Sequence, residues 1–103
     1  MNVIAPRALR AFAEHHPESE PVLREWYNHL RRIEPQNFAE LRTHFNSVDA
    51  ARTADDLTVF IFDVGGNKYR VVCSINFASS LAFLKLILTH DEYTLWNKRG
   101  RPI

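Results

Sequence analysis

Residues 58–75 of the chain read TVFIFDVGGNKYRVVCSI. The segments 58–62 and 69–75 are rich in β-branched and aromatic residues, which fit the pleated surface of a sheet. Between them, Gly65, Gly66 and Asn67 are residues that accept the positive φ angles of a tight hairpin turn. The sequence therefore predicts two antiparallel strands joined by a short turn.

On the C-terminal side of this hairpin, a polar turn at 76–80 precedes a further apolar strand at 81–88. The next four residues, Thr89-His90-Asp91-Glu92, form a capping-box pattern. This pattern predicts a short helix that begins at His90 and carries Tyr93 and Trp96. The tail 98–101 is basic and is expected to be loose.

On the N-terminal side, residues 1–4 fit a short first strand, and two amphipathic helices follow. The first is predicted from Leu9, Phe12 and Ala13, and it ends at Pro17 because the residue before a proline avoids the helical region. The second comes after a tight turn and keeps the 3.6-residue period in its apolar positions, which are Val22, Leu23, Trp26, Tyr27, Leu30 and Ile33.

A third, short helix is expected after Asn37, which together with Glu40 resembles a capping box. The polar segment 46–56 is expected to be a loop. Because helices come first and a meander of strands follows, the fold class predicted is α+β. The N-terminal helices pack on one face of a small, mainly antiparallel sheet, and a short helix ends the chain.

The composition indicates one domain that spans residues 1–103, with 46% hydrophobic and 24% charged residues. The longest apolar run is only eight residues, too short to cross a membrane, and the N-terminus lacks a signal-peptide pattern. The single cysteine, Cys73, cannot form an internal disulfide, which suits the cytoplasm. A chain of this size leaves little room for an enclosed cavity, so a site is expected at the surface.

The net charge of +1 conceals an asymmetry between the two halves. Residues 1–56 hold seven Lys/Arg and nine Asp/Glu, whereas residues 57–103 hold six Lys/Arg and three Asp/Glu. This difference indicates the C-terminal half as the place for a polyanionic partner such as a nucleic acid. The alternative is that this asymmetry arose by chance, because the excess of positive charge in the C-terminal half is small.

Alternation along the strands predicts where the cations point. Tyr69, Val71, Cys73 and Ile75 share one face, so Lys68 and Arg70 project from the other, about 7 Å apart. In the next strand Leu84, Leu86 and Leu88 alternate with Phe83, Lys85 and Ile87. If these leucines face the helices, Lys85 joins the other two cations; the alternative is three solvated charges.

His90 is placed where a strand ends and a helix begins, a position where backbone N–H groups attract anions. A histidine titrates near neutral pH, as a general acid or base must. Tyr93 follows one turn later on the same side of the helix and could stack on a base or contact a phosphate. The alternatives are a helix-capping or merely exposed histidine and a packing tyrosine.

Metal and cofactor chemistry finds no support in the sequence. No histidine pair has ligand spacing with a cysteine, and His90-Asp91-Glu92 lacks the P-C-x-x-C that a zinc deaminase requires. Gly65-Gly66 lacks a phosphate-loop pattern. Cys73 is interpreted as a buried strand thiol. We therefore expect neither a metal nor a cofactor.

Several segments together resemble the HigB family of toxins, within the wider RelE-like group. They are Asn-Val-Ile (2–4), Asn-Phe-Ala-Glu-Leu-Arg (37–42), Asp-Leu-Thr-Val-Phe (56–60), Gly-Gly-Asn-Lys-Tyr-Arg (65–70) and Leu-Thr-His-Asp-Glu-Tyr (88–93). The resemblance covers nearly the whole chain in order and implies a RelE-like fold. One departure is that Tyr93 is followed by Thr94-Leu95, where family members often have Asp-Lys. Any role of that terminal lysine passes to Lys98 or is absent.

The resemblance implies an endoribonuclease toxin of a type II toxin–antitoxin system that cleaves mRNA, commonly on translating ribosomes. The implied partner is a HigA-like antitoxin with a helix-turn-helix domain. Operator DNA is then contacted only through the antitoxin complex, and no membrane is involved. The alternative is a non-catalytic RNA- or ribosome-binding module that acts as the regulatory partner of a DNA-binding repressor.

The residues expected to carry this activity come from the C-terminal half. Lys68, Arg70, His90 and Tyr93 are the catalytic candidates, with charge from the cations, proton transfer by His90 and stacking or phosphate contact by Tyr93. A lysine with a pKa lowered by neighbouring cations could serve as the base instead. Further RNA contacts are expected from Asn67, Lys85, Lys98 and Arg99.

Overall fold

The predicted hairpin is present in the computed structural model of the protein, which describes residues 1–4 and 6–103. Strand β3 (Thr58–Val64) pairs antiparallel with β4 (Tyr69–Asn76), and Val64 lies opposite Tyr69 at the turn. The three turn residues that were predicted to need positive φ angles have them: Gly65 at 70°, Gly66 at 61° and Asn67 at 73°. The turn chemistry therefore determines this hairpin as expected.

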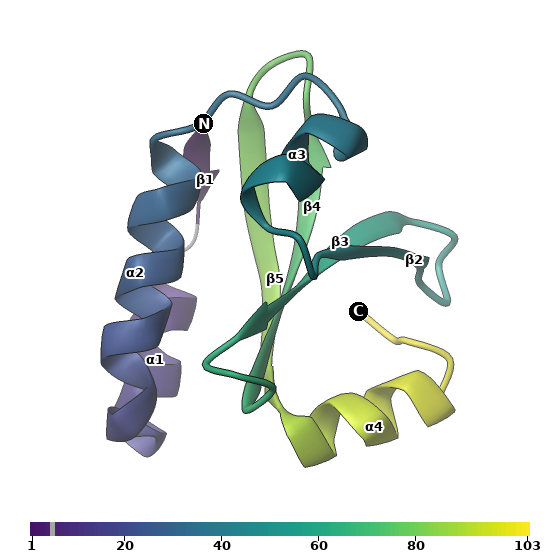
Figure 1. The fold of residues 1–103 in the computed structure, drawn as a ribbon. Coiled ribbons are helices and arrows are strands. Elements are labelled where there is room, and N and C mark those ends of the chain that lie inside the picture. Colours follow the sequence, from purple (N-terminus) through teal and green to yellow (C-terminus); the bar gives the residue numbers. More distant parts are fainter. Residues whose placement is uncertain (5) are drawn as a thin grey trace.

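The hairpin lies inside a five-stranded sheet with the order β1-β5-β4-β3-β2 (Figure 1). Strand β5 (Leu81–Thr89) pairs antiparallel with β4, and the short β1 (Asn2–Ile4) pairs parallel with β5. Strand β2 (Asp49–Arg52) adds antiparallel to β3 at the opposite edge. The sheet is thus mainly antiparallel, as predicted.

Three helices cover one face of this sheet. They are α1 (Pro6–His15), α2 (Glu20–Arg31) and α3 (Phe38–His44), with a 3₁₀ turn, η1 (Pro17–Ser19), between the first two. Their apolar residues pack against Phe60, Phe62, Val71 and Cys73 in the main core. Asn37 caps α3 by accepting a hydrogen bond from the backbone N–H of Glu40. The predicted helices are therefore confirmed.

A fourth helix, α4 (His90–Lys98), lies on the opposite face of the sheet (Figure 1). Trp96 of this helix forms a second, smaller core with Val59, Ile61 and Val72. The helix begins at His90, as its capping box predicts, since Thr89 and Glu92 make both hydrogen bonds of the motif. The sheet is therefore buried on both faces at this end.

The C-terminal tail is held against the fold, so the expectation of a loose tail is wrong. The backbone N–H of Arg101 donates to the carbonyl of Trp96, and its Nε donates to Oδ1 of Asn97 at 2.9 Å. Its own carbonyl accepts from the N–H of Ala54. Trp96 and Asn97 are near Arg101 in sequence and Ala54 is far from it, but the basic composition of the tail indicates none of these contacts.

Two further expectations are corrected by the sheet. The predicted loop 46–56 contains β2, whose sequence Asp-Ala-Ala-Arg has weak strand propensity and which forms because it pairs with β3. In β5, a register shift opposite Val72/Cys73 interrupts the alternation. Leu84 consequently packs with the main core, whereas Leu86 and Leu88 pack with the second core.

None of the helices in the described part of the chain has the length and apolar character that a membrane crossing requires.

Candidate functional site

Arg70 occupies the predicted face of β4, on the α4 side of the sheet, and its guanidinium is held on several sides. Its Nη1 donates to Oδ1 of Asp63 at 3.2 Å, and its Nη2 donates to Oδ1 of Asn67 at 3.2 Å. The guanidinium carbon lies 5.0 Å from the centroid of the Tyr93 ring. Only 13% of the Arg70 side chain is exposed. This arginine is therefore oriented by the protein before any ligand binds.

Asp63 also belongs to this cluster and was not among the residues predicted from the sequence. It is the cross-strand partner of Arg70 in the hairpin, and its Oδ1 also accepts from the backbone N–H of Asn67 at 2.9 Å. One carboxylate thus fixes both the turn and the arginine. An acidic and a basic residue that flank a short turn at paired positions are the signal that could have identified it.

His90 is the first residue of α4, as predicted, and its side chain is exposed. Its backbone N–H donates to the carbonyl of Lys68 at 3.1 Å, which ties the helix start to the β3–β4 turn. The N–H of Glu92 is also satisfied, by Oγ1 of Thr89 at 3.3 Å. The backbone N–H groups of His90 and Glu92 therefore already have hydrogen-bond partners within the protein. The exposed side chain of His90 is the group that remains available to a ligand.

Tyr93 is half-buried and connects the arginine to the second core. Its ring packs beside Trp96, with ring centroids 6.1 Å apart, and under the guanidinium of Arg70. A cation above an aromatic face is attracted by the ring quadrupole. Packing and function are thus compatible roles for this tyrosine.

The remaining predicted residues lie outside this cluster. Lys85 is exposed in the middle of β5, near the register shift, and Lys98 and Arg99 lie at the far end of α4. Eight helical steps separate His90 from Lys98, or about 12 Å. Five predicted residues therefore gather at one end of the sheet, namely Asn67, Lys68, Arg70, His90 and Tyr93. The other three cations are distributed along the same side.

Charge at the gathered end is mixed. Lys68 and Arg70 share it with Asp63 and with the first-turn carboxylates of α4, Asp91 and Glu92. Arg70 is paired with Asp63, and Glu92 is engaged in the capping box. The site therefore depends on the placement of individual charges rather than on a broad positive surface.

Burial raises the pKa of the Cys73 thiol far above its ordinary value. The side chain has no exposed surface and belongs to the main core. A thiol that stays protonated and inaccessible is not a nucleophile. The interpretation of Cys73 as a structural residue is confirmed.

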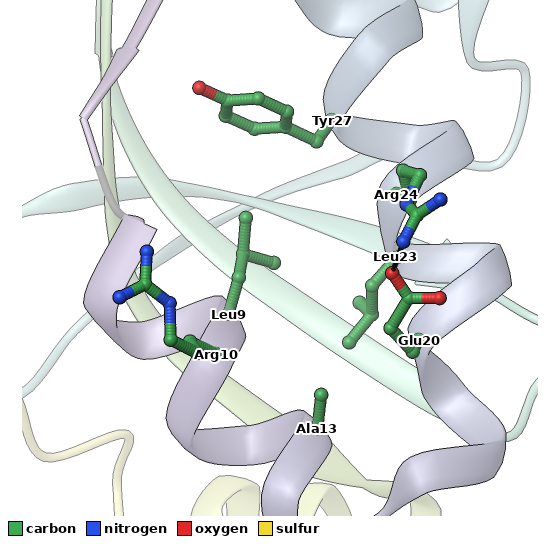
Figure 2. A pocket seen from close by; sticks show the side chains of 7 residues that line it. All are labelled: Leu9, Arg10, Ala13, Glu20, Leu23, Arg24 and Tyr27. Atoms are coloured by element: carbon green, nitrogen blue, oxygen red, sulfur yellow. Dashed lines mark hydrogen bonds and ion pairs between the residues drawn. The ribbon is translucent and has the colours of Figure 1, made fainter.

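A mainly apolar groove lies elsewhere, between α1 and α2. It has a volume of about 310 Å³, and Figure 2 shows Leu9, Ala13, Leu23 and Tyr27 around it, with Arg10 and an Arg24–Glu20 ion pair at its rim. Because α1 and α2 cover the face of the sheet that Tyr69 and Val71 occupy, this groove is separated from Arg70 by the sheet itself. It does not belong to the cluster described above.

A metal site would need several ligands that converge. Within residues 1–4 and 6–103, no group of three or more His, Cys, Asp or Glu side chains is arranged to hold a metal ion. The predicted residues at the cluster offer a guanidinium, an ammonium group, an imidazole and a phenol.

The order of elements defines the class of protein. Two helices, a short third helix, an antiparallel meander and a final helix on the opposite face make up a RelE-like α+β domain. Residues 19–96 match the family of HigB toxins, described as the RelE-like toxic component of a toxin–antitoxin system. This match spans most of the chain, and the chain belongs to the HigB toxin family. Membership implies an antitoxin as partner.

Relatives in Escherichia coli and Shigella flexneri have the same family name. The chain is 30% identical over 93 residues to the mRNA interferase toxin HigB of Escherichia coli K12, which covers 90% of this chain and 88% of that protein. The mRNA interferase HigB of Shigella flexneri has the same identity and coverage. The mRNA interferase HigB of E. coli O6:H1 is 29% identical over the same shares of both chains.

Proposed function

We propose that this chain is an endoribonuclease toxin that cleaves mRNA. Its membership of a toxin family and the names of its relatives support the proposal. The observation that carries it is the oriented guanidinium of Arg70, held by Asp63 and Asn67 over the ring of Tyr93, beside the start of α4. A phosphodiester placed against this cluster would meet positive charge and an imidazole.

The reaction needs few groups from the protein, because RNA supplies its own nucleophile. The 2′-oxygen loses its proton and attacks the adjacent phosphorus, which forms a 2′,3′-cyclic phosphate. The bond from phosphorus to the 5′-oxygen breaks, and that oxygen takes a proton. The protein must therefore position the strand, move protons and stabilise the negative charge of the pentacoordinate phosphorus.

Each of these tasks has a candidate group in the cluster. Arg70 and Lys68 stabilise the negative charge on the phosphate oxygens, for which a planar guanidinium with several N–H donors is well suited. His90, exposed at the first position of α4, transfers a proton. Tyr93 stacks on a base or contacts the phosphate. Asn67, Lys85, Lys98 and Arg99 contact other parts of the RNA in this proposal.

The proposal extends to the setting in which the chain works. Residues 1–103 act as one domain in the cytoplasm, and cleavage takes place on the translating ribosome. The antitoxin is a HigA-like protein with a helix-turn-helix domain, and operator DNA is bound only through the complex. The match to the HigB toxin family supports an antitoxin as partner, and the names of the relatives support mRNA as the substrate.

The test compares Arg70→Ala and His90→Ala with the parent chain in an inducible strain. Each variant is expected to relieve growth arrest and to lower the rate of RNA cleavage by about a hundredfold or more, because a contact to the transition state is lost. Cleavage sites are mapped by primer extension on mRNA after brief induction. Matched controls are Arg10→Ala and His15→Ala, which remove exposed residues of the same types from α1.

Two results would contradict the proposal. Full toxicity of both Arg70→Ala and His90→Ala would show that the cluster is not the site. A parent chain that binds RNA but leaves mRNA intact in induced cells, where ribosomes are present, would instead support a non-catalytic binding module. Circular dichroism of each purified variant separates loss of activity from loss of fold.

A further inference from the structure

Phe83 is the most exposed aromatic residue of this chain among the residues that the structure describes. It has 36% of its surface exposed, whereas the rings of the two cores are buried or half-buried. It belongs to neither the main core nor the second core. The Phe83 ring thus contributes little to the packing of the fold, and its exposure to water costs free energy.

The register of the sheet places Phe83 on the same face as Arg70. Phe83 lies opposite Ser74 of β4, and Ser74 alternates with Val72 and Arg70 on the α4 side of that strand. On its other side Phe83 lies opposite Ile4 of β1, which is 45% exposed. Phe83 and Ile4 therefore form a small apolar surface near the β1 edge of the sheet.

Lys85 adds a charge to this surface. Its ammonium nitrogen lies 6.0 Å from the centroid of the Phe83 ring. The register shift opposite Val72/Cys73 makes this possible, because Leu84 packs into the main core while Lys85 stays exposed. An accessible aromatic face beside an ammonium group is the combination that binds a base and its phosphate in single-stranded nucleic acids.

The distance from this surface to Arg70 suits a single strand of RNA. Ser74 and Arg70 are four residues apart on β4, which corresponds to about 13 Å. Between them lie Val72, which is fully buried, and Leu86, which is half-buried, both packed in the second core beside α4. At this separation, a strand with its scissile phosphate at Arg70 reaches the Phe83 ring within a few nucleotides if it runs over this side of the molecule toward the β1 edge.

We propose that Phe83 is a stacking platform for an RNA base outside the scissile position, with Lys85 on the neighbouring phosphate. This inference deepens the proposed function and rests on it for the substrate. The ring contributes a sequence-tolerant contact, because every base has a π-face. Such a contact acts on binding and leaves the chemical step at Arg70 and His90 unchanged.

The test measures affinity and cleavage separately. Binding is followed by fluorescence anisotropy with a single-stranded 2′-O-methyl oligonucleotide of mixed sequence, which cannot be cleaved because its 2′-oxygens are blocked. Phe83→Leu keeps an apolar side chain and removes the aromatic face, and it is expected to weaken binding by about 5- to 100-fold. Phe83→Tyr keeps the face and is expected to bind within about twofold of the parent chain. Leu57→Ala, another exposed apolar residue, is the matched control.

Cleavage assays complete the design. Phe83→Leu is expected to raise KM while kcat stays close to that of the parent, as for loss of uniform binding. Lys85→Met is expected to reduce the salt dependence of binding by about one phosphate contact.

The outcomes separate this inference from the proposed function. Parent-like RNA affinity of Phe83→Leu would overturn the inference while leaving cleavage by the chain untouched. If that variant lost antitoxin binding instead, the surface would be a protein contact, and the inference would again be wrong. A parent chain that bound the oligonucleotide through Phe83 but cleaved no RNA would contradict the proposed function alone. Absence of RNA binding by the parent chain would overturn this inference, whereas the proposed function is judged separately, by mRNA cleavage in induced cells.

Discussion

Arg70 shows how one residue can be prepared for a ligand by its neighbours. Strand alternation predicts its face correctly, because Tyr69 and Val71 are demonstrably on the core side. The contacts with Asp63 and Asn67 are not predictable from alternation, since they depend on the exact pairing of two strands across the turn. The same ion pair also has a cost, because the Asp63 carboxylate weakens the attraction of the Arg70 guanidinium for a phosphate.

The substitution Asp63→Asn is therefore expected to change RNA binding and the rate of cleavage in opposite directions. Removing the negative charge is expected to tighten RNA binding at low salt. Loss of the charged partner leaves Arg70 less well oriented, so kcat is expected to fall by about tenfold or more. Anisotropy with uncleavable RNA measures the first effect and single-turnover cleavage the second.

Asp55→Asn is the control, because it removes the same charge from an exposed loop residue. An unchanged kcat in Asp63→Asn would show that Asp63 only fixes the turn, through its hydrogen bond from the N–H of Asn67.

Elements that depend on local signals were predictable, and elements that depend on pairing were not. The Gly65-Gly66-Asn67 turn and the Thr89/Glu92 capping box each carry their own chemistry within a few residues. Strand β2 has weak strand propensity of its own and exists because β3 lies beside it. The register shift in β5 likewise depends on how Leu84 and Leu86 are shared between two cores. Local sequence patterns do not indicate strand pairings and register shifts of this kind, because these depend on residues far apart in the chain.

The capping box of α4 links the stability of this helix to the candidate site, because His90 is the first residue of the helix. Thr89→Ala removes the side-chain oxygen that accepts from the N–H of Glu92 and is expected to cost about 1 kcal/mol of the free energy of unfolding. In a domain of this size that corresponds to a Tm lower by about 5 °C. Because His90 follows directly, cleavage is expected to fall as well.

Thermal unfolding and RNA cleavage are measured together on Thr89→Ala and Thr89→Ser. The serine variant keeps an accepting hydroxyl and is expected to restore both properties. Equal Tm values for the two variants would mean that the cap does not stabilise α4.

At the scale of the whole molecule, a few contacts join parts of the chain that are far apart in sequence. The N-terminal ammonium group donates to the carbonyl of Ile33 at 2.7 Å, and Trp96 Nε1 donates to the carbonyl of Pro102 at 2.7 Å. The hydroxyl of Tyr69 donates to Oε1 of Glu18 at 3.0 Å across 51 residues, which joins η1 to the sheet. This last contact makes the stability of the fold depend on pH.

The sign of that dependence follows from two shifted groups. Burial, and then the hydrogen bond and charge of Glu18, raise the pKa of Tyr69 above 10.0. Hydrogen bonds, first from its own backbone and then from Tyr69, lower the pKa of Glu18 below 4.5. The Tyr69 contribution to stability is therefore complete below pH 10 and is lost as the pH rises toward its raised pKa. The Glu18 contribution is complete above pH 4.5 and is lost as the pH falls through its lowered pKa.

Tyr69→Phe removes the shared hydrogen bond, so the variant is expected to be less stable than the parent by the largest margin near pH 7. The margin is expected to shrink below pH 4 and above pH 10, where one partner in the parent changes its protonation state. Urea unfolding of both proteins at pH 3, 7 and 10.5 measures it, and the difference between the two proteins cancels the titration of all other groups. Tyr27→Phe serves as control, because the Tyr27 hydroxyl makes no hydrogen bond within the described residues. A margin that stayed constant with pH would mean that Tyr69 stabilises the fold through its buried ring alone.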